Sequence, residues 1–155
     1  MKFIADAMLG RLAKWLRLLG FDVLYYPDIE DREVIRISRE HDRTILTRDT
    51  CMLQCRGARD AVFIRSDHIS EQLLEMKDML ALHDSDRGER CIVCNGNLHK
   101  VSDRGEVQDL VPDYVYHSFE SFMRCNVCAK VYWEGSHFKK IRERISEILK
   151  KSDED

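Results

Sequence analysis

Four of the six cysteines stand in two pairs, each with a two-residue spacer: Cys91/Cys94 and Cys125/Cys128. This spacer lets both thiolates of a pair point at one tetrahedral ion, and a small residue soon after the pair favours a tight turn. Two such pairs in one short region predict a structural zinc site with four thiolate ligands. Disulfides would need an oxidising compartment, and we find no export signal that would lead there.

A second set of residues that could do chemistry is acidic and follows apolar runs of strand length. Its members are Asp6, then Asp28, Glu30 and Asp31, then Asp49, then Asp67. Carboxylates held together repel one another and take up protons unless a cation neutralises them. Oxygen ligands favour Mg²⁺ or Mn²⁺, which can activate water for attack on a phosphodiester. For each aspartate, the structural alternative is a helix N-cap.

The elements that must position these acids alternate between two periods. Strand-length runs cover residues 2–5, 23–26, 44–47 and 61–64, and helical spacing covers residues 8–19, 31–41 and 70–82, the last with Ser70 as N-cap. This order predicts an α/β fold with a parallel sheet and helices on its faces. Ligands of open parallel sheets bind at the carboxyl ends of the strands, so we expect the acids to converge there.

The first helix is expected to be amphipathic. Its apolar face would hold Met8, Leu9, Leu12, Trp15, Leu16 and Leu19. The opposite face would carry Arg11, Lys14 and Arg17 into solvent. An acidic pocket repels a polyanion, so bases should flank it, and we predict that these three residues and Arg48 bind the substrate.

The polar segment HDSDRGER, before Cys91, predicts a domain boundary between residues 1–86 and 87–155. Residues 95–124, between the cysteine pairs, are expected to hold an inserted hairpin or loop, and the chain should end in a helix. Six aromatic residues of this half either fill its core, which we favour, or stack on bases: Tyr114, Tyr116, Phe119, Phe122, Tyr132 and Trp133.

Composition narrows the classes of function only slightly. The chain has 155 residues and a net charge of −3, so bulk charge does not indicate a nucleic-acid binder, and such binding must come from local patches. No apolar run reaches the roughly 20 residues that a membrane span needs. We expect a soluble, cytoplasmic protein with no membrane partner.

Several of these motifs occur together in one known family. DAMLGRLAKWLRLLGFDV, ILTRD, CIVCNGNL and RCNVCAKVYWEGSH, in this order, resemble the Mut-seven C-terminal RNase family, in which a PIN-like domain is fused to a zinc ribbon. The resemblance implies a PIN-like nuclease fold and divalent-metal-dependent RNA cleavage. By position it implies catalytic, Mg²⁺- or Mn²⁺-binding roles for Asp6, Asp31 and Asp49, with Asp28 as the neighbouring candidate. The segment PDIEDRE also offers Glu30 and Glu33 for the place of Asp31.

The leading hypothesis is therefore a metal-dependent ribonuclease that acts on single-stranded or structured RNA, assisted by a zinc ribbon. The alternative is a non-catalytic RNA- or ribosome-associated module whose acids are remnants. A phosphoacceptor receiver domain would also place acids after its first and third strands. This chain lacks the adjacent acidic pair after strand one that such a domain needs, and we rank that hypothesis last.

Overall fold

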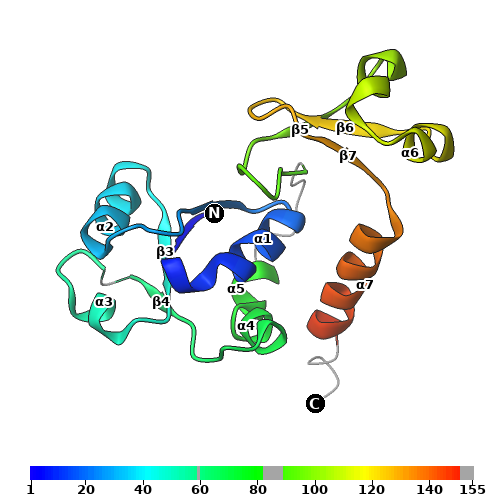
Figure 1. The fold of residues 1–155 in the computed structure, drawn as a ribbon. Coiled ribbons are helices and arrows are strands. Elements are labelled where there is room, and N and C mark those ends of the chain that lie inside the picture. The colour runs from blue at the N-terminus through cyan, green and yellow to red at the C-terminus, as the bar shows by residue number, and fades with distance from the viewer. Residues whose placement is uncertain (59, 82–88, 151–155) are drawn as a thin grey trace.

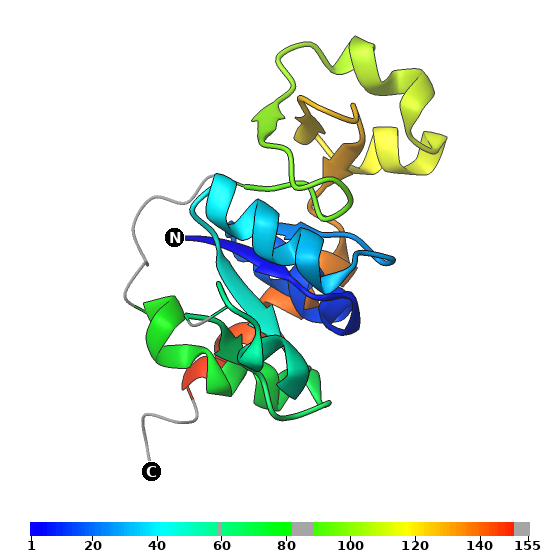
Figure 2. The same cartoon turned by 90° about the vertical axis from the view of Figure 1, so that its left-hand side faces the viewer.

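The protein is described by a computed structural model that covers residues 1–58, 60–81 and 89–150. It contains a four-stranded parallel sheet flanked by helices and a separate three-stranded antiparallel sheet (Figure 1). The two sheets occupy different parts of the molecule, and the last helix returns from the small sheet to the large one (Figures 1 and 2). The predicted domain boundary, at residues 86 and 87, lies outside the described residues.

The parallel sheet confirms the α/β expectation. Its strands are β1 (Lys2–Ala5), β2 (Asp22–Tyr25), β3 (Thr44–Thr47) and β4 (Val62–Phe63), in the order β2-β1-β3-β4. All pairs are parallel, and β1 is central, with Ile4 opposite both Leu24 and Ile45. The chain order reverses between β1 and β3, so the carboxyl ends of these two strands form the expected ligand-binding edge.

Helices cover both faces of this sheet. They are η1 (Ala7–Leu9), α1 (Gly10–Leu18), α2 (Asp31–Glu40), α3 (Thr50–Gln54), α4 (Ile69–Glu75) and α5 (Lys77–Ala81). Because side chains alternate along a strand, Phe3 and Ala5 pack with α1, α4 and α5, whereas Ile4 packs with α2 and α3. Two cores therefore hold the sheet rigid on both sides.

Two helix predictions are wrong in detail. The first helix begins at Gly10 after a 3₁₀ turn, so Met8 leaves the predicted apolar face and is 63% exposed. The predicted helix over 70–82 is divided into α4 and α5, and its N-cap is His68, because Ser66 and not Ser70 forms the preceding turn. The Ser66 hydroxyl oxygen accepts a hydrogen bond from the His68 amide at 3.0 Å.

The small sheet contains β5 (Leu98–Lys100), β6 (Phe122–Cys125) and β7 (Val131–Trp133), all antiparallel. The segment between β5 and β6 is not the expected hairpin or loop. It forms two short helices, η2 (Arg104–Leu110) and α6 (Asp113–Ser118). Val107 and Val115 pack from these helices against Phe122 of the sheet, and this apolar contact gives the insertion its helical form.

The expected last helix is present as α7 (Ser136–Lys150). Its Ile145 is fully buried in the core formed by α1 and α4, so α7 packs against the large sheet unit. In the described ranges of the chain, no helix combines the length and the apolar character that crossing a membrane requires.

Candidate functional site

Asp6 lies at the carboxyl end of β1, where its side chain is 5% exposed. Its Oδ1 accepts a hydrogen bond from the Met8 amide at 2.9 Å and thereby caps η1. Its Oδ2 accepts from the Thr47 hydroxyl at 2.5 Å and from the Arg48 amide at 2.8 Å. These hydrogen bonds hold the carboxyl group in place and join the ends of β1 and β3.

Asp49 follows β3 and caps α3, because its Oδ1 accepts from the Cys51 amide at 2.8 Å. Asp31 is the first residue of α2 and is exposed. Burial raises the pKa of the Asp31 carboxyl, and the charges of Asp49 and Asp6 raise it further. The three acids predicted from the sequence are therefore near enough to repel one another.

Helix capping accounts for only some of the carboxylate oxygens of these three acids. Asp6 and Asp49 do cap helices, but each cap engages one oxygen. For the Asp31 side chain, the described part of the chain records no hydrogen bond. Across the same residues, no Lys or Arg forms an ion pair with any of the three acids. Within the described residues, their mutual repulsion is thus not offset by an ion pair with a Lys or Arg side chain.

Asp28 and Asp67 lie apart from this group. Asp28 is exposed in a shallow hollow with Tyr26, Glu33 and Arg36, and its charge is not among the causes that raise the pKa of Asp31. Asp67 is exposed beside His68, at 3.5 Å from its imidazole. The charges of Asp6 and Asp49 thus act on Asp31, whereas Asp28 and Asp67 are not among the causes of its raised pKa.

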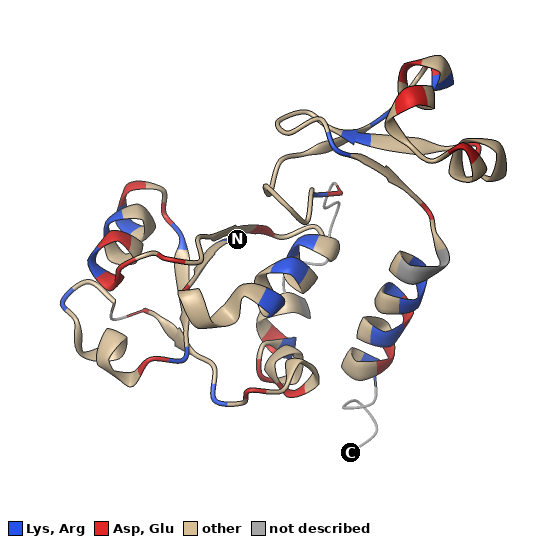
Figure 3. Cartoon of the chain, viewed as in Figure 1, with Lys and Arg blue, Asp and Glu red and all other residues tan. Residues whose placement is uncertain are grey.

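The four basic residues predicted to bind the substrate differ in their exposure. Arg11 and Lys14 are exposed on α1, which begins four residues after Asp6. Figure 3 shows basic positions along this helix. Arg48 is half-buried and donates at 3.5 Å to the carbonyl of Arg65. The prediction that Arg17 lies on the solvent face is wrong, because its side chain is 4% exposed. Its guanidinium donates to the main-chain carbonyls of Val23, Ile92 and Val93.

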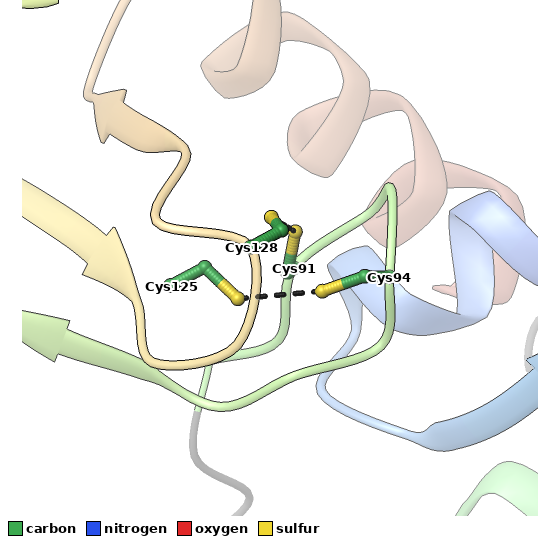
Figure 4. A group of neighbouring side chains, drawn as sticks. All are labelled: Cys91, Cys94, Cys125 and Cys128. Carbon is green, nitrogen blue, oxygen red and sulfur yellow. Dashed lines mark hydrogen bonds between the residues drawn. The ribbon is translucent and has the colours of Figure 1, made fainter.

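The four paired cysteines meet in one cluster, as their spacing predicts (Figure 4). Their sulfur atoms lie within 4.8 Å of one another, with 3.4 Å between Cys94 and Cys125 and 3.7 Å between Cys91 and Cys128. Four sulfurs at about 2.3 Å from one zinc ion would be separated by roughly 3.8 Å. The cluster can therefore hold a tetrahedral metal ion such as zinc. Over the described residues, no group of acids is as tightly gathered.

The thiols of this cluster differ in their electrostatics. Burial alone would raise the pKa of Cys91, but hydrogen bonds from the Tyr132 hydroxyl and from the amides of Cys94 and Val93 outweigh it and lower the pKa to about 6. Burial raises the pKa of Cys94 to about 12. One thiolate thus forms readily while its neighbour resists ionisation. A cation among the sulfurs would resolve this conflict.

The residue directly after each cysteine pair has a left-handed backbone conformation: Asn95 at φ 68° and Ala129 at φ 62°. The small residue predicted to favour the turn, Gly96, has another role. A Cβ there would lie 2.8 Å from the Cys125 sulfur and 2.8 Å from the Val127 side chain. Gly96 is required because the second pair passes directly over it.

Hydrogen bonds also connect the first cysteine pair to the parallel-sheet unit. Arg17 Nε donates to the carbonyl of Val23 at 2.9 Å, and its Nη1 donates to the carbonyls of Ile92 at 2.9 Å and Val93 at 3.2 Å. Asn95 bridges the same junction and contacts β2. Neither role was found from the sequence, since Arg17 reads as one base of a solvated helix face and Asn95 as a turn residue.

The comparisons with known proteins agree with the motifs. A model of the Mut7-C RNAse domain matches residues 1–145. No curated protein and no solved structure matches the chain. Because the family model covers nearly the whole chain, the protein belongs to the Mut7-C RNAse domain family.

Proposed function

We propose that the protein is a PIN-like, divalent-metal-dependent ribonuclease that hydrolyses RNA phosphodiester bonds. Membership of the RNAse domain family supports a nuclease with RNA as its substrate. The observation that carries the metal-dependent part is the group formed by Asp6, Asp31 and Asp49 at the carboxyl ends of the parallel strands. Burial raises the pKa of Asp31, the charges of Asp49 and Asp6 raise it further, and no Lys or Arg side chain in the described residues forms an ion pair with the three acids.

The donor set fits a hard divalent cation. Carboxylate oxygens are the ligands that Mg²⁺ and Mn²⁺ prefer, and Mg²⁺ usually keeps several waters besides one or two carboxylates. Asp31 and the second oxygen of Asp49 would hold the ion, with Asp6 fixed by its three donors at the base of the site. The ion would supply a bound water of lowered pKa as the nucleophile.

RNA would reach this site along basic side chains. Arg11 and Lys14 are exposed along α1, and Arg48 flanks Asp49, so these residues would contact phosphates. Arg17 is withdrawn from this role by its burial. We propose that zinc in the cysteine cluster is structural, because four thiolates leave no open coordination position. The zinc ribbon would then assist RNA binding.

Cleavage of end-labelled RNA tests the proposal. Purified protein is incubated with single-stranded and hairpin RNAs in the presence of Mg²⁺, Mn²⁺ or neither, and the product ends are identified. We expect cleavage only with a divalent ion and products that carry a 5′-phosphate. Asp49→Asn should lose the activity. Asp60→Asn should retain it, because Asp60 is an exposed acid just before the amino end of β4, and the candidate site lies at the carboxyl ends of the strands.

Two results would contradict the proposal. Activity that survives in Asp49→Asn would belong to a contaminant or to another site. A protein that neither cleaves any RNA nor binds Mn²⁺ in calorimetry would be the non-catalytic RNA-binding module, with the acids acting only as caps. Both measurements use the zinc-loaded protein, so the outcome reports on the carboxylates alone.

A further inference from the structure

A cavity of about 230 Å³ lies where several separate segments of the chain meet. Its walls are mostly apolar and come from the end of α1, the first cysteine pair, the antiparallel sheet and the start of α7: Leu18, Ile92, Met123, Tyr132, Trp133 and Phe138. This volume is below the roughly 300–1,000 Å³ that drug-sized ligands occupy. The cavity is therefore suited to a single planar ring system.

The walls and the rim differ in character. Trp133 is half-buried, and a Cβ at Gly135 would lie 3.2 Å from the indole Nε1, so the glycine leaves space for the edge of this ring. At the rim, Arg142 of α7 forms an ion pair with Glu89 at 3.1 Å, and both side chains are more than two-fifths exposed. An aromatic wall beside a guanidinium and a carboxylate offers stacking together with both a donor and an acceptor.

The position of the cavity connects it to the acidic edge. Helix α1 begins beside Asp6 and its last residue, Leu18, lines the cavity. Nine residues of helix span about 13 Å, so a short length of extended RNA would reach from one site to the other. The exposed Arg11 and Lys14 lie on this helix between them.

We infer that this cavity, which we call the ribbon pocket, binds one nucleobase of the RNA a few nucleotides from the scissile phosphate. The base stacks against Trp133, and its polar edge meets Glu89 and Arg142 at the rim. The inference rests on the proposed ribonuclease function and gives the ribbon a definite task in it. Base–aromatic stacking accepts every base, so the pocket contributes affinity with modest sequence preference.

Tryptophan fluorescence tests the inference directly. The chain has two tryptophans, so Trp15→Phe leaves Trp133 as the sole reporter. This variant is titrated with each nucleoside 5′-monophosphate and with ribose 5-phosphate, without added Mg²⁺ or Mn²⁺. We expect saturable quenching by the nucleotides and none by ribose 5-phosphate, which carries the same phosphate but no base. Equal quenching by both, or quenching by neither, would overturn the inference.

Rim variants give a matched comparison in the same background. Arg142→Gln should weaken nucleotide binding several-fold, whereas Arg144→Gln removes an exposed charge of α7 that does not line the pocket and should leave binding unchanged. Equal losses in both variants would indicate general electrostatics and would refute the pocket.

RNA cleavage is measured in parallel so that the two proposals fail separately. Cleavage without nucleotide quenching would refute the ribbon pocket and leave the nuclease standing. Quenching without cleavage in any metal would refute the nuclease and keep the pocket as a base-binding site. Asp31→Asn should abolish cleavage and preserve quenching, because Asp31 belongs to the acidic group with Asp6 and Asp49 and does not line the ribbon pocket.

Discussion

Asn95 of the first cysteine pair donates its side-chain Nδ2 to Oδ1 of Asp22 in β2 at 2.7 Å, although 73 residues separate them. The same side chain accepts a hydrogen bond from the Val23 amide at 2.9 Å. Two arginines also form ion pairs with Asp22, Arg43 at 2.6 Å and Arg90 at 3.8 Å. The metal-binding turn is thus fixed to the edge strand of the parallel sheet by buried polar contacts.

Replacing Asn95 by glycine tests how far this bridge stabilises the protein. Glycine tolerates the φ of 68° at this position, so Asn95→Gly removes the side chain without new backbone strain. The Val23 amide loses its acceptor in a buried position, and we expect the free energy of unfolding to fall by about 1–3 kcal/mol. Urea denaturation of the zinc-loaded protein measures this. Unchanged stability would mean that water replaces the amide without cost.

The same junction predicts a dependence of stability on pH. Burial alone would raise the pKa of the Asp22 carboxyl, but hydrogen bonds from Arg43 and Asn95, with the charges of Arg43 and Arg90, outweigh it and lower the pKa. A carboxyl whose pKa is lower in the folded state stabilises fully above its ordinary pKa of about 3.9. This contribution is lost as the pH falls from that value through the lowered one.

Unfolding free energies between pH 3 and 6 check this expectation. Wild type should lose more stability than Asp22→Asn over the acidic part of the range, so the difference between the two should shrink as the pH falls. Loss of metal from protonated thiols affects both proteins and cancels in the comparison. A constant difference across the range would contradict a role for the Asp22 charge.

The fold was predictable where local pattern and tertiary packing agree. The four strands lie within a residue or two of their expected positions, because a buried parallel strand is a short apolar run bounded by polar residues. Helix starts were less predictable. Met8 fits an apolar helix face by spacing, but Asp6 caps a 3₁₀ turn and moves the start of α1 to Gly10. A helical wheel that includes the residues of this 3₁₀ turn therefore places Met8 on the wrong face.

The candidate site shows the same limit more sharply. Residue types and spacing were sufficient for the cysteine cluster, because each pair specifies its own turn. Arg17 could not be assigned from spacing, since its carbonyl partners at Ile92 and Val93 are 75 and 76 residues away. A buried guanidinium is stable only where acceptors meet it, and the sequence does not say which main-chain carbonyls will be free.

Arg17→Met should show that the buried guanidinium is structural. Methionine fills a similar volume but leaves the carbonyls of Val23, Ile92 and Val93 without this donor. We expect a loss of at least about 2 kcal/mol in unfolding free energy, as for other buried charge-assisted contacts. Lys14→Met, on the exposed face of the same helix, should change stability by less than about 0.5 kcal/mol. Equal effects would place Arg17 in solvent.

Gly96 and Ala129 occupy comparable turns after the two cysteine pairs, and opposite substitutions should have opposite effects. Gly96→Ala places a Cβ 2.8 Å from the Cys125 sulfur, so that ligand must move, and zinc affinity should fall roughly 10–100-fold. Ala129→Gly relieves an alanine at φ 62° and should raise stability by up to about 1 kcal/mol. Competition with a chromophoric chelator and thermal denaturation measure these. Full zinc affinity in Gly96→Ala would contradict the close approach.

Asp6 and Asp31 should respond differently to replacement by asparagine, although both are expected to abolish activity. Asp6 accepts from three donors, and an asparagine must turn its NH₂ group toward at least one of them. Asp6→Asn should therefore cost about 1–3 kcal/mol of stability as well as RNA cleavage. Asp31 is exposed and repelled by Asp49 and Asp6, so Asp31→Asn should leave the metal-free protein as stable or slightly more stable.

Cleavage should fall at least about 100-fold in both variants, because several kcal/mol of metal-derived stabilisation depend on the carboxylates. Calorimetric Mn²⁺ titration and urea denaturation of the same preparations separate ligand loss from unfolding. Asp28→Asn is the informative comparison, since Asp28 lies in the loop before α2 and its charge is not among those that raise the pKa of Asp31. If Asp28→Asn lost activity while Asp31→Asn retained it, the third carboxylate of the site would be Asp28, and α2 would contribute through its preceding loop instead of its first residue.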